Sequence, residues 1–453
     1  MSTKVSIQTI GWLSISVIGL VAIGFFVWQI WVGGPLSQAI EYEQRGDFYK
    51  DNNELQQAKE WYRKSIKAFQ SLGEQERVAN KTEKLGAFYY SKDDLATAEE
   101  MYKKSLEAFQ AIQNRRAVAK QYGNLGLLYA NHNDLQRAEQ MYINSLNTYQ
   151  AINNQNGIAN QYSNLGSIYV MAGALQSAEE MFQKSLEIYK ALNSHGDVAD
   201  QYINLGNLYH VQGKWQLTEE LYFKSLEINN RLGNQAKMAE QYGNISNLYY
   251  RQGKIKFAWG HSLKSLEIWK TLGNQEKMAK QYNFLGLIYT KQNDKQHAEE
   301  MYLQSLQINQ ALGNQEQLAI QYHNMGQFYA MYKDWQSAEQ MFLKNLQLNQ
   351  TLDHQQKIAN QQSNLGNLYY TIGDLPRAEA AFTKSLEINQ ALEQKQKVAS
   401  QYGNLGHLYR KRGDFQQAKD NYLKSFQIFN ELGHANTQRV QQFLDQLAIS
   451  KNH

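Results

Sequence analysis

The chain has 453 residues, of which 42% are hydrophobic and 19% are charged, and its formal net charge is +4. This near balance of basic and acidic side chains disfavours a nucleic-acid-binding protein, whose usual mark is a basic stripe. Cysteine is absent, which excludes disulfide frameworks, thiol catalysis and zinc–thiolate sites. Only two prolines occur, so long uninterrupted helices are favoured.

The first distinctive segment is an uncharged run from 10 to 32, IGWLSISVIGLVAIGFFVWQIWV. As a helix it would be about 35 Å long, enough to cross a hydrocarbon layer of about 30 Å. Trp12, Trp28 and Trp31 stand near its ends, where interfacial indoles are expected. We therefore predict a short tail at 1–9, a transmembrane signal anchor at 10–32 and a linker at 33–40.

The charges on either side of this run help to predict how the segment is oriented in the membrane. Lys4 and the amino terminus oppose Arg45 and Lys50, which is close to a tie under the positive-inside rule. The short tail favours a cytoplasmic N-terminus, and the rest of the chain would then be extracytoplasmic, or periplasmic in a bacterium; a cytoplasmic location is the alternative. A secreted protein is another alternative, because the segment 37–39 has a small-x-small cleavage pattern, although the apolar run exceeds the roughly 7–15 residues of a signal peptide.

From 41 to 440 the sequence repeats every 40 residues without insertion or deletion, which gives ten blocks. Tyr recurs in all ten, Gly three residues before it in nine, and Ala twelve residues after that Gly position in nine. In the block that begins at 121, Tyr122, Leu125 and Tyr129 follow the spacing of one helix face, and apolar residues between 138 and 146 follow it again. Each block is therefore predicted to be two helices that stack on their neighbours.

Small and amide residues mark the turns between these helices. Asn, Asp or Gly separates the two helices in nine blocks, with Lys333 as the exception, and these residues tolerate the left-handed conformation that ends a helix. The next residue is Asp in six blocks, as at Asp134 and Asp374, which predicts an N-cap for the second helix. The pattern as a whole predicts an all-α fold.

These columns resemble the tetratricopeptide repeat (TPR), whose Leu-Gly, Tyr, Ala and aromatic signature reads here as Leu125-Gly126, Tyr129, Ala138 and Tyr142. The usual repeat has about 34 residues, and the longer repeat is similar to those of kinesin light chains and Leu-Gly-Asn-repeat scaffolds. The resemblance implies a right-handed superhelical solenoid of ten helix-turn-helix units at 41–440. A capping helix and tail are predicted at 441–453. A HEAT-type array is the alternative, against which the Gly and Ala columns speak.

An asparagine precedes the Leu-Gly position in seven blocks, although asparagine is a mediocre helix former. The column consists of Asn124, Asn164, Asn204, Asn244, Asn324, Asn364 and Asn404. In the resembled family the first helices line the concave wall, and matching asparagines form a ladder that holds an extended peptide by its backbone. An amide both donates and accepts hydrogen bonds, so we predict peptide binding along this column. The alternatives are bonds between adjacent repeats and recent duplication of one block.

Variable positions beside the column are the candidates for groove specificity. They are Asn207, His210, Asn247, Tyr250, Gln327, Asn367, Tyr370, His407 and Arg410. No motif for a metal, a cofactor or catalysis occurs, so we predict no enzyme activity. We predict a membrane-anchored scaffold or adaptor that binds a partner protein or an extended peptide. A peptide or small-ligand sensor that signals through a change of the superhelix is the alternative.

One block, 241–280, departs from the pattern. Ser246 replaces the Gly, Ser262 replaces the aromatic residue, and Gly260 interrupts the second helix. An interior Gly costs about 0.5–1 kcal/mol, and loss of a buried ring costs about 3–5 kcal/mol. We expect either that Trp259 or a neighbour fills the space or that this block is the weakest joint, with neutral drift as the alternative.

Overall fold

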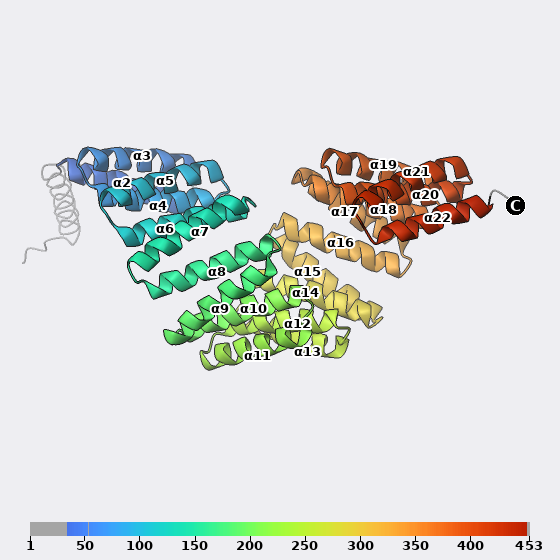
Figure 1. The fold of residues 1–453 in the computed structure, drawn as a ribbon, viewed down its shortest axis with the longest axis horizontal. Helices are drawn as coiled ribbons and strands as arrows, with labels where there is room; N and C mark the ends of the chain where they lie inside the picture. The colour runs from blue at the N-terminus through green and yellow to red at the C-terminus, as the bar shows by residue number, and fades with distance from the viewer. Residues whose placement is uncertain (1–33, 53, 451–453) are drawn as a thin grey trace, which may run out of the picture. The chain divides into compact units, whose positions relative to one another are not determined.

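The computed structural model describes residues 34–52 and 54–450, and every regular element within them is an α-helix (Figure 1). Two compact units make up the chain, Met1–Ile228 and Asn229–His453, with the boundary inside α11. The helices up to this boundary are α2 (Pro35–Asp51), α3 (Leu55–Ser71), α4 (Gln75–Ser91), α5 (Leu95–Ala111), α6 (Arg115–Asn131), α7 (Leu135–Ala151), α8 (Gln155–Met171), α9 (Leu175–Ala191), α10 (His195–Val211) and α11 (Trp215–Arg231). Those that follow are α12 (Gln235–Arg251), α13 (Ile255–Thr271), α14 (Gln275–Lys291), α15 (Lys295–Ala311), α16 (Gln315–Met331), α17 (Trp335–Thr351), α18 (Gln355–Ile372), α19 (Leu375–Ala391), α20 (Lys395–Arg412), α21 (Phe415–Glu431) and α22 (Asn436–Ser450).

Successive helices pair two by two within each unit. Most even-numbered helices pack most extensively on the odd-numbered helix that follows them, as α6 does on α7 and α18 on α19. A residue with positive φ ends most helices, including Asn133 at 59° and the predicted exception Lys333, also at 59°. All six aspartates predicted as N-caps accept a hydrogen bond from a backbone N–H three residues on; they are Asp94, Asp134, Asp294, Asp334, Asp374 and Asp414.

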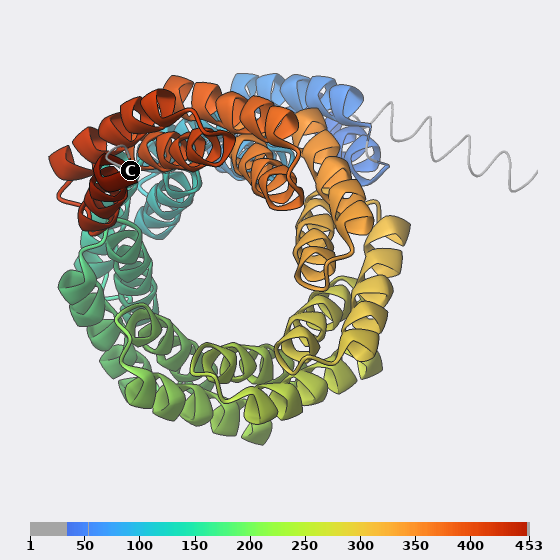
Figure 2. The ribbon, with the colours of Figure 1, turned by 90° about the vertical axis from the view of Figure 1, so that its right-hand side faces the viewer.

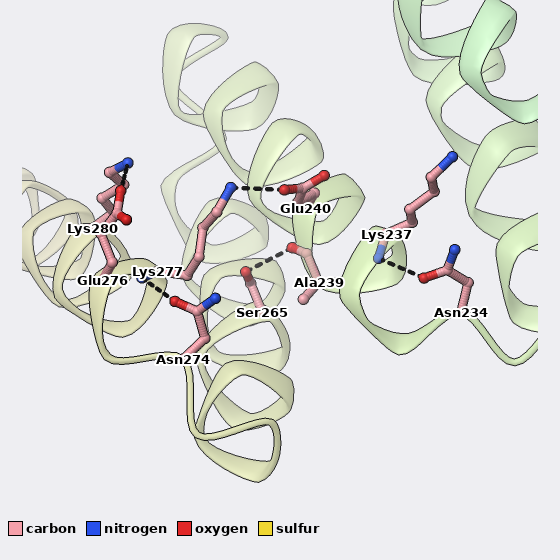
Figure 3. A network of polar contacts seen from close by, with 9 residues as sticks. All are labelled: Asn234, Lys237, Ala239, Glu240, Ser265, Asn274, Glu276, Lys277 and Lys280. Carbon is pink, nitrogen blue, oxygen red and sulfur yellow. Dashed lines mark hydrogen bonds and ion pairs between the residues drawn. The ribbon is translucent and has the colours of Figure 1, made fainter. Parts of the chain in front are cut away.

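Asparagines cap the first helices of several repeats in the same way, which the sequence analysis did not anticipate. Figure 3 shows two of them, with Asn234 Oδ1 accepting from Lys237 N at 3.2 Å and Asn274 Oδ1 accepting from Lys277 N at 3.0 Å. These caps fix the helix starts, and α6, which contains Tyr122, Leu125 and Tyr129, begins at Arg115.

The two helices of a repeat are joined by a close crossing. The ring of Tyr142 on α7 lies against Gly126 on α6, where a Cβ atom would be 2.7 Å from a ring carbon. Deeper in the same crossing the buried Ser145 hydroxyl donates to the carbonyl oxygen of Ala119 at 2.7 Å. Figure 3 shows the matching bond from Ser265 to Ala239. The Gly, aromatic and Ser positions therefore fix how the helix pair packs.

A second contact joins six of the repeats to the repeat before them. The hydroxyl of Tyr129 on α6 donates to the Glu99 carboxylate on α5 at 2.8 Å. The same bond, always across 30 residues, is made by Tyr169, Tyr209, Tyr329, Tyr369 and Tyr409. In these six repeats the recurring tyrosine is thus a link between neighbouring repeats.

The described chain ends are packed on the repeats next to them. At the N-terminal end Ala39 on α2 is fully buried, and its carbonyl oxygen accepts from Ser65 at 3.1 Å. At the C-terminal end Val440 and Leu447 of α22 are buried against the last repeat, in one cluster with Phe429. Within residues 34–52 and 54–450 no helix is long and apolar enough to span a membrane. The anchor predicted at 10–32 lies outside the described residues.

Candidate functional site

The ladder asparagines lie on the even-numbered helices. In each unit the helices form two layers (Figure 2), and members of the even-numbered layer contact each other directly, as α8 does α10 and α14 does α16. We call the open side of this layer the inner face of each unit. All seven ladder asparagines are half-buried, so their amides lie between the helices of this layer with part of each side chain accessible.

In the first unit, three ladder residues donate hydrogen bonds to their own chain. The Nδ2 atoms of Asn124, Asn164 and Asn204 lie 3.3, 3.4 and 3.3 Å from the Oε1 atom of the glutamine three residues earlier. Asn204 also donates to the Ser163 hydroxyl on the preceding even-numbered helix, at 3.2 Å. The glutamine bonds lie within one helix, and only the bond from Asn204 to Ser163 connects neighbouring first helices, as the structural alternative expects.

In the second unit the pattern continues with one exception. Asn364 and Asn404 donate to their glutamines at 3.3 Å, and Asn324 donates to Asn283 Oδ1 on α14 at 3.1 Å. Asn244 makes no hydrogen bond with any described residue. Within residues 34–52 and 54–450, moreover, no donor reaches the Oδ1 atom of any ladder asparagine. The chain therefore holds most of the amide nitrogens and leaves the carbonyl oxygens open.

The glutamines that orient the ladder form a buried polar column that the sequence analysis missed. Members with 0–6% exposure are Gln121, Gln161, Gln201, Gln241, Gln321, Gln361 and Gln401. Two of them are fixed by main-chain carbonyls, with Gln321 donating to Tyr302 O at 2.9 Å and Gln361 to Phe342 O at 3.2 Å. Their recurrence at the same 40-residue interval as the asparagines was the available signal.

Two specificity candidates are engaged by the tyrosine of the second helix. Asn207 Oδ1 accepts from the Tyr222 hydroxyl at 2.6 Å, and a 2.8 Å hydrogen bond joins His407 Nδ1 to the Tyr422 hydroxyl. His407 also lies edge-on to Phe443 of α22, with ring centroids 4.5 Å apart, and burial beside Arg410 lowers its pKa. Gln327 and Asn367 are exposed, and the aromatic residues at the matching position, Phe342 and Phe382, carry no hydroxyl that could bond to them.

The remaining candidates pack against neighbouring side chains. His210 contacts the Trp215 ring and Tyr250 contacts the Phe284 ring, with centroids 5.3 and 5.4 Å apart. Tyr370 has the Lys411 ammonium 4.4 Å from its ring centroid, Asn247 is half-buried, and Arg410 donates to Gln446 on α22 at 3.3 Å. His407 and Arg410 are thus in contact with the C-terminal helix, whereas Gln327 and Asn367 remain open.

A polar hollow of about 190 Å³ lies in the second unit, between α16, α17 and α18. It adjoins the ladder, because Asn364 and His323 line it together with Gln361. Burial lowers the pKa of His323, and its Nδ1 atom lies 3.4 Å from Asn364 Nδ2. Its floor contains Asn349, at a position where several other repeats have an aromatic residue.

A larger hollow of about 550 Å³ occupies the equivalent place in the first unit. Phe109 and Tyr149 contribute to its lining, and the ion pair of Lys120 with Glu83, 2.5 Å long, lies along it. The two hollows therefore share a position in the repeat and differ in chemistry. In the described part of the chain no cluster of His, Asp or Glu side chains could hold a metal ion.

Family models match much of the chain. A tetratricopeptide repeat model matches residues 77–151, 116–191 and 316–391, and two further models with that description match 398–432 and 42–71. This chain is a tetratricopeptide repeat protein. A model of the soluble NSF attachment protein, SNAP, matches residues 193–319 of the same repeat array. No curated protein sequence matches this TPR protein.

Several solved structures are similar to this TPR protein. The Pyrococcus horikoshii signal transduction ATPase with numerous domains, which has a tetratricopeptide repeat sensor, is 16% identical with a TM-score of 0.54 over 77% of this chain and 54% of that chain. BtubC (BKLC) from P. vanneervenii is 25% identical with a TM-score of 0.45, over 49% and 92%. A Rap protein complexed with competence and sporulation factor is 14% identical with a TM-score of 0.45, over 74% and 98%. The similarity to the ATPase is a similarity of fold alone.

Proposed function

We propose that this TPR protein is a scaffold that binds a partner protein through an extended segment lying along the asparagine ladder. The observation that carries the proposal is that the two polar atoms of the ladder amides differ in their hydrogen bonding. The chain's own acceptors hold Nδ2 in six of seven residues, while Oδ1 has no donor in the described part of the chain. An oxygen oriented in this way is pre-organised to accept a peptide N–H.

The internal bonds alone do not account for the column. Several of them are 3.3–3.4 Å long, beyond the usual range for N–H···O bonds, and are therefore weak. Asn244 makes none of them, so at that position the internal bonds give no reason for asparagine. Each peptide N–H that a ladder oxygen accepts would contribute roughly 0.5–1.5 kcal/mol. Several rungs together would give useful affinity without a deep pocket.

We further propose that residues 10–32 anchor this scaffold in a membrane with the repeats on the extracytoplasmic side. The long uncharged run and the short tail with Lys4 support this arrangement. Cleavage after Ala39 would remove the first turn of α2 together with a fully buried side chain and the acceptor of the Ser65 bond. Retention of the N-terminal segment is therefore favoured. The right-handed superhelical course implied by the family resemblance also stays a prediction.

Photo-crosslinking in membranes tests the scaffold proposal. A benzophenone amino acid at Gln327 on the inner face is compared with one at Lys384, an exposed residue of α19. We expect a partner segment to be captured from Gln327 and not from Lys384. A synthetic peptide of that segment should then bind the triple variant of Asn204, Asn244 and Asn364 to Ala about 5- to 150-fold more weakly, which corresponds to about 1–3 kcal/mol. Equal capture at both positions, or unchanged affinity, would refute the proposal.

A further inference from the structure

Asn349 on α17 has a buried acceptor atom without a donor. The side chain is 2% exposed, at a column where Tyr149 and Tyr189 stand in other repeats. Its Nδ2 atom donates to the carbonyl oxygen of Asn345 at 3.0 Å and to Asn345 Oδ1 at 2.8 Å. No donor within residues 34–52 and 54–450 reaches its Oδ1 atom. A buried carbonyl oxygen in this state is costly, and a ligand that donates to it removes the cost.

The next repeat shows which chemical group satisfies this oxygen. Asn389 occupies the same column 40 residues later, and its Oδ1 accepts from the carboxamide Nε2 of Gln356 at 3.3 Å. Glu316 at the start of α16 holds the place that Gln356 holds at the start of α18. An ionised carboxylate accepts hydrogen bonds and cannot donate one. At Asn349 the oxygen therefore lacks the donor that Gln356 supplies to Asn389, and a carboxamide is the group that fits the matching site.

Ile320 leaves two charged side chains of the hollow without the partners they have in an earlier repeat. Figure 3 shows that Lys280 pairs with Glu276 at 2.5 Å and that Glu240 pairs with Lys277 at 2.7 Å. Ile320 stands in the same column as Glu240 and Lys280, which lie 80 and 40 residues earlier. It therefore replaces both the carboxylate that would pair with Lys357 and the ammonium that would pair with Glu316. It is 45% exposed and supplies an apolar wall.

Glu316 and Lys357 therefore face the hollow with little compensation. The carboxylate of Glu316 has one described ion-pair neighbour, His354 Nε2 at 3.9 Å. The Lys357 ammonium makes no ion pair or hydrogen bond with any residue that the structure describes, whereas Lys397 in the next repeat donates to Asn360 at 2.8 Å. Both side chains line the hollow with Asn349 and Ile320. Two hydrogen-bond acceptors, Asn349 Oδ1 and the Glu316 carboxylate, and one donor, Lys357, thus lie beside the apolar side chain of Ile320.

We infer that this hollow binds the side-chain carboxamide of an asparagine or glutamine in the segment held by the ladder, which rests on the proposed scaffold function. The ligand NH₂ group donates to Asn349 Oδ1 beside the Glu316 carboxylate. Its carbonyl oxygen accepts from Lys357, and its methylene groups contact Ile320. The volume of about 190 Å³ exceeds that of several water molecules, at about 30 Å³ each, and so admits such a side chain.

Other side chains fit the hollow less well. An aspartate or glutamate would bring a carboxylate against Asn349 Oδ1 and Glu316, which are both acceptors. A leucine would leave Asn349 Oδ1 without a donor. A lysine would satisfy that oxygen but would place its charge beside Lys357. It would also offer no carbonyl oxygen to accept a hydrogen bond from Lys357. The carboxamide alone among these groups offers a donor and an acceptor without charge.

A peptide library screened against the purified full chain in detergent micelles tests the inference. The probes are N-acetylated, C-amidated dodecapeptides in which each position is varied among Asn, Gln, Asp, Glu, Lys and Leu. We expect Asn or Gln to be enriched about tenfold at one position. Glu316→Gln should abolish that enrichment, because the new carboxamide satisfies Asn349 from within, as Gln356 satisfies Asn389. Glu316 is exposed, so this variant keeps the fold.

Two further variants complete the design. Asn349→Leu removes the acceptor and should also abolish the enrichment, whereas Asn389→Leu, the matched control in the next repeat, should keep it. Binding of library peptides without a carboxamide preference, or a preference that survives Glu316→Gln, overturns the carboxamide site and leaves the scaffold function standing. Failure of every peptide to bind would overturn the scaffold function and, with it, this inference.

Discussion

The indole Nε1 of Trp259 donates a hydrogen bond of 2.9 Å to the hydroxyl of Tyr289. Trp259 stands where Glu299 stands one repeat later, and there the Tyr329 hydroxyl donates to the carboxylate at 2.8 Å. The link between repeats is thus kept at 241–280 with a neutral bond, and the tyrosine has become the acceptor. Trp259 therefore serves this link, whereas the sequence analysis considered it only as a replacement for the missing ring.

The missing ring at 262 is matched by a change in the helix it would touch. Ser246 takes the place of the glycine that faces the ring elsewhere, and its hydroxyl donates to Ala258 O at 2.6 Å. Ser262 donates to Gln281 Oε1 at 3.1 Å. Both serines are fully buried and bonded. The two substitutions therefore belong together, because a Cβ at 246 and a ring at 262 would compete for one volume.

Variants at both positions should consequently be strongly non-additive. Ser262→Tyr alone should destabilise α13 by about 1–3 kcal/mol, the usual range for overpacking, since the ring meets the Ser246 side chain. Adding Ser246→Gly should recover at least about 0.5–3 kcal/mol of coupling. Hydrogen exchange of the α12 and α13 amides measures both effects. Additive changes would show that the two positions do not share space.

Gly260 offers a separate test of the weakness expected in this block. α13 runs unbroken from Ile255 to Thr271, and a Cβ at Gly260 would meet nothing within 4 Å. Gly260→Ala should therefore stabilise the helix by about 0.5–1 kcal/mol. In the unchanged protein, amides near Gly260 should exchange faster than those near Glu300. Gly126→Ala is the opposing control, because its Cβ would lie 2.7 Å from the Tyr142 ring, and it should destabilise.

The tyrosine–glutamate links should make stability sensitive to acid. Burial by itself raises the pKa of Glu99, but bonds from Lys103 and from the Tyr129 hydroxyl lower it below the ordinary value of 4.5. A carboxyl group with a lowered folded pKa stabilises the protein above about pH 4.5, and this contribution is lost as the pH falls through the folded value. Glu99→Gln, which cannot ionise, should melt at a lower temperature than the unchanged protein at pH 6. The gap should narrow as the pH is lowered below 4.5, and a gap independent of pH would contradict the role of this charge.

The turns of this fold could be predicted from the sequence because the residues that form them act over a short range. Asn133 and Asp134 each act within one turn of chain, through a left-handed backbone and an N-cap, so spacing alone located them. The caps at Asn114 and its equivalents, which mark the starts of the first helices, were not recognised. They recur at the same 40-residue spacing as the aspartate caps of the second helices.

The candidate site was less accessible to sequence reasoning. The asparagine column is visible as letters, but the bond from Asn124 to Gln121 depends on side-chain placement. The hollow at Asn349 arises because Glu316 and Ile320, which lie on a different helix, face it. In the sequence Asn349 and Glu316 have equivalents in other repeats, and only Ile320 is unique in its column. That the three residues line one hollow becomes evident only from the packing of the helices.

The ladder itself can be divided into its structural and binding roles by two single variants. Asn244 makes no hydrogen bond in the described part of the chain, whereas Asn204 donates to Gln201 and Ser163. Asn244→Ala should keep or slightly raise the melting temperature, because alanine is the better helix former. Asn204→Ala should lower it, since the variant loses the 3.2 Å bond to Ser163, which contributes about 0.5–1.5 kcal/mol.

Affinity for the captured partner peptide should fall in both variants alike. Removal of one rung of about 0.5–1.5 kcal/mol predicts a loss of roughly two- to twelvefold for each. Thermal melting and peptide titration on the same samples provide the two readouts. If Asn204→Ala lowers the melting temperature while Asn244→Ala binds with unchanged affinity, the asparagines serve the scaffold and the partner is held elsewhere. If Asn244→Ala weakens binding at unchanged stability, the open carbonyl oxygen is what the partner contacts.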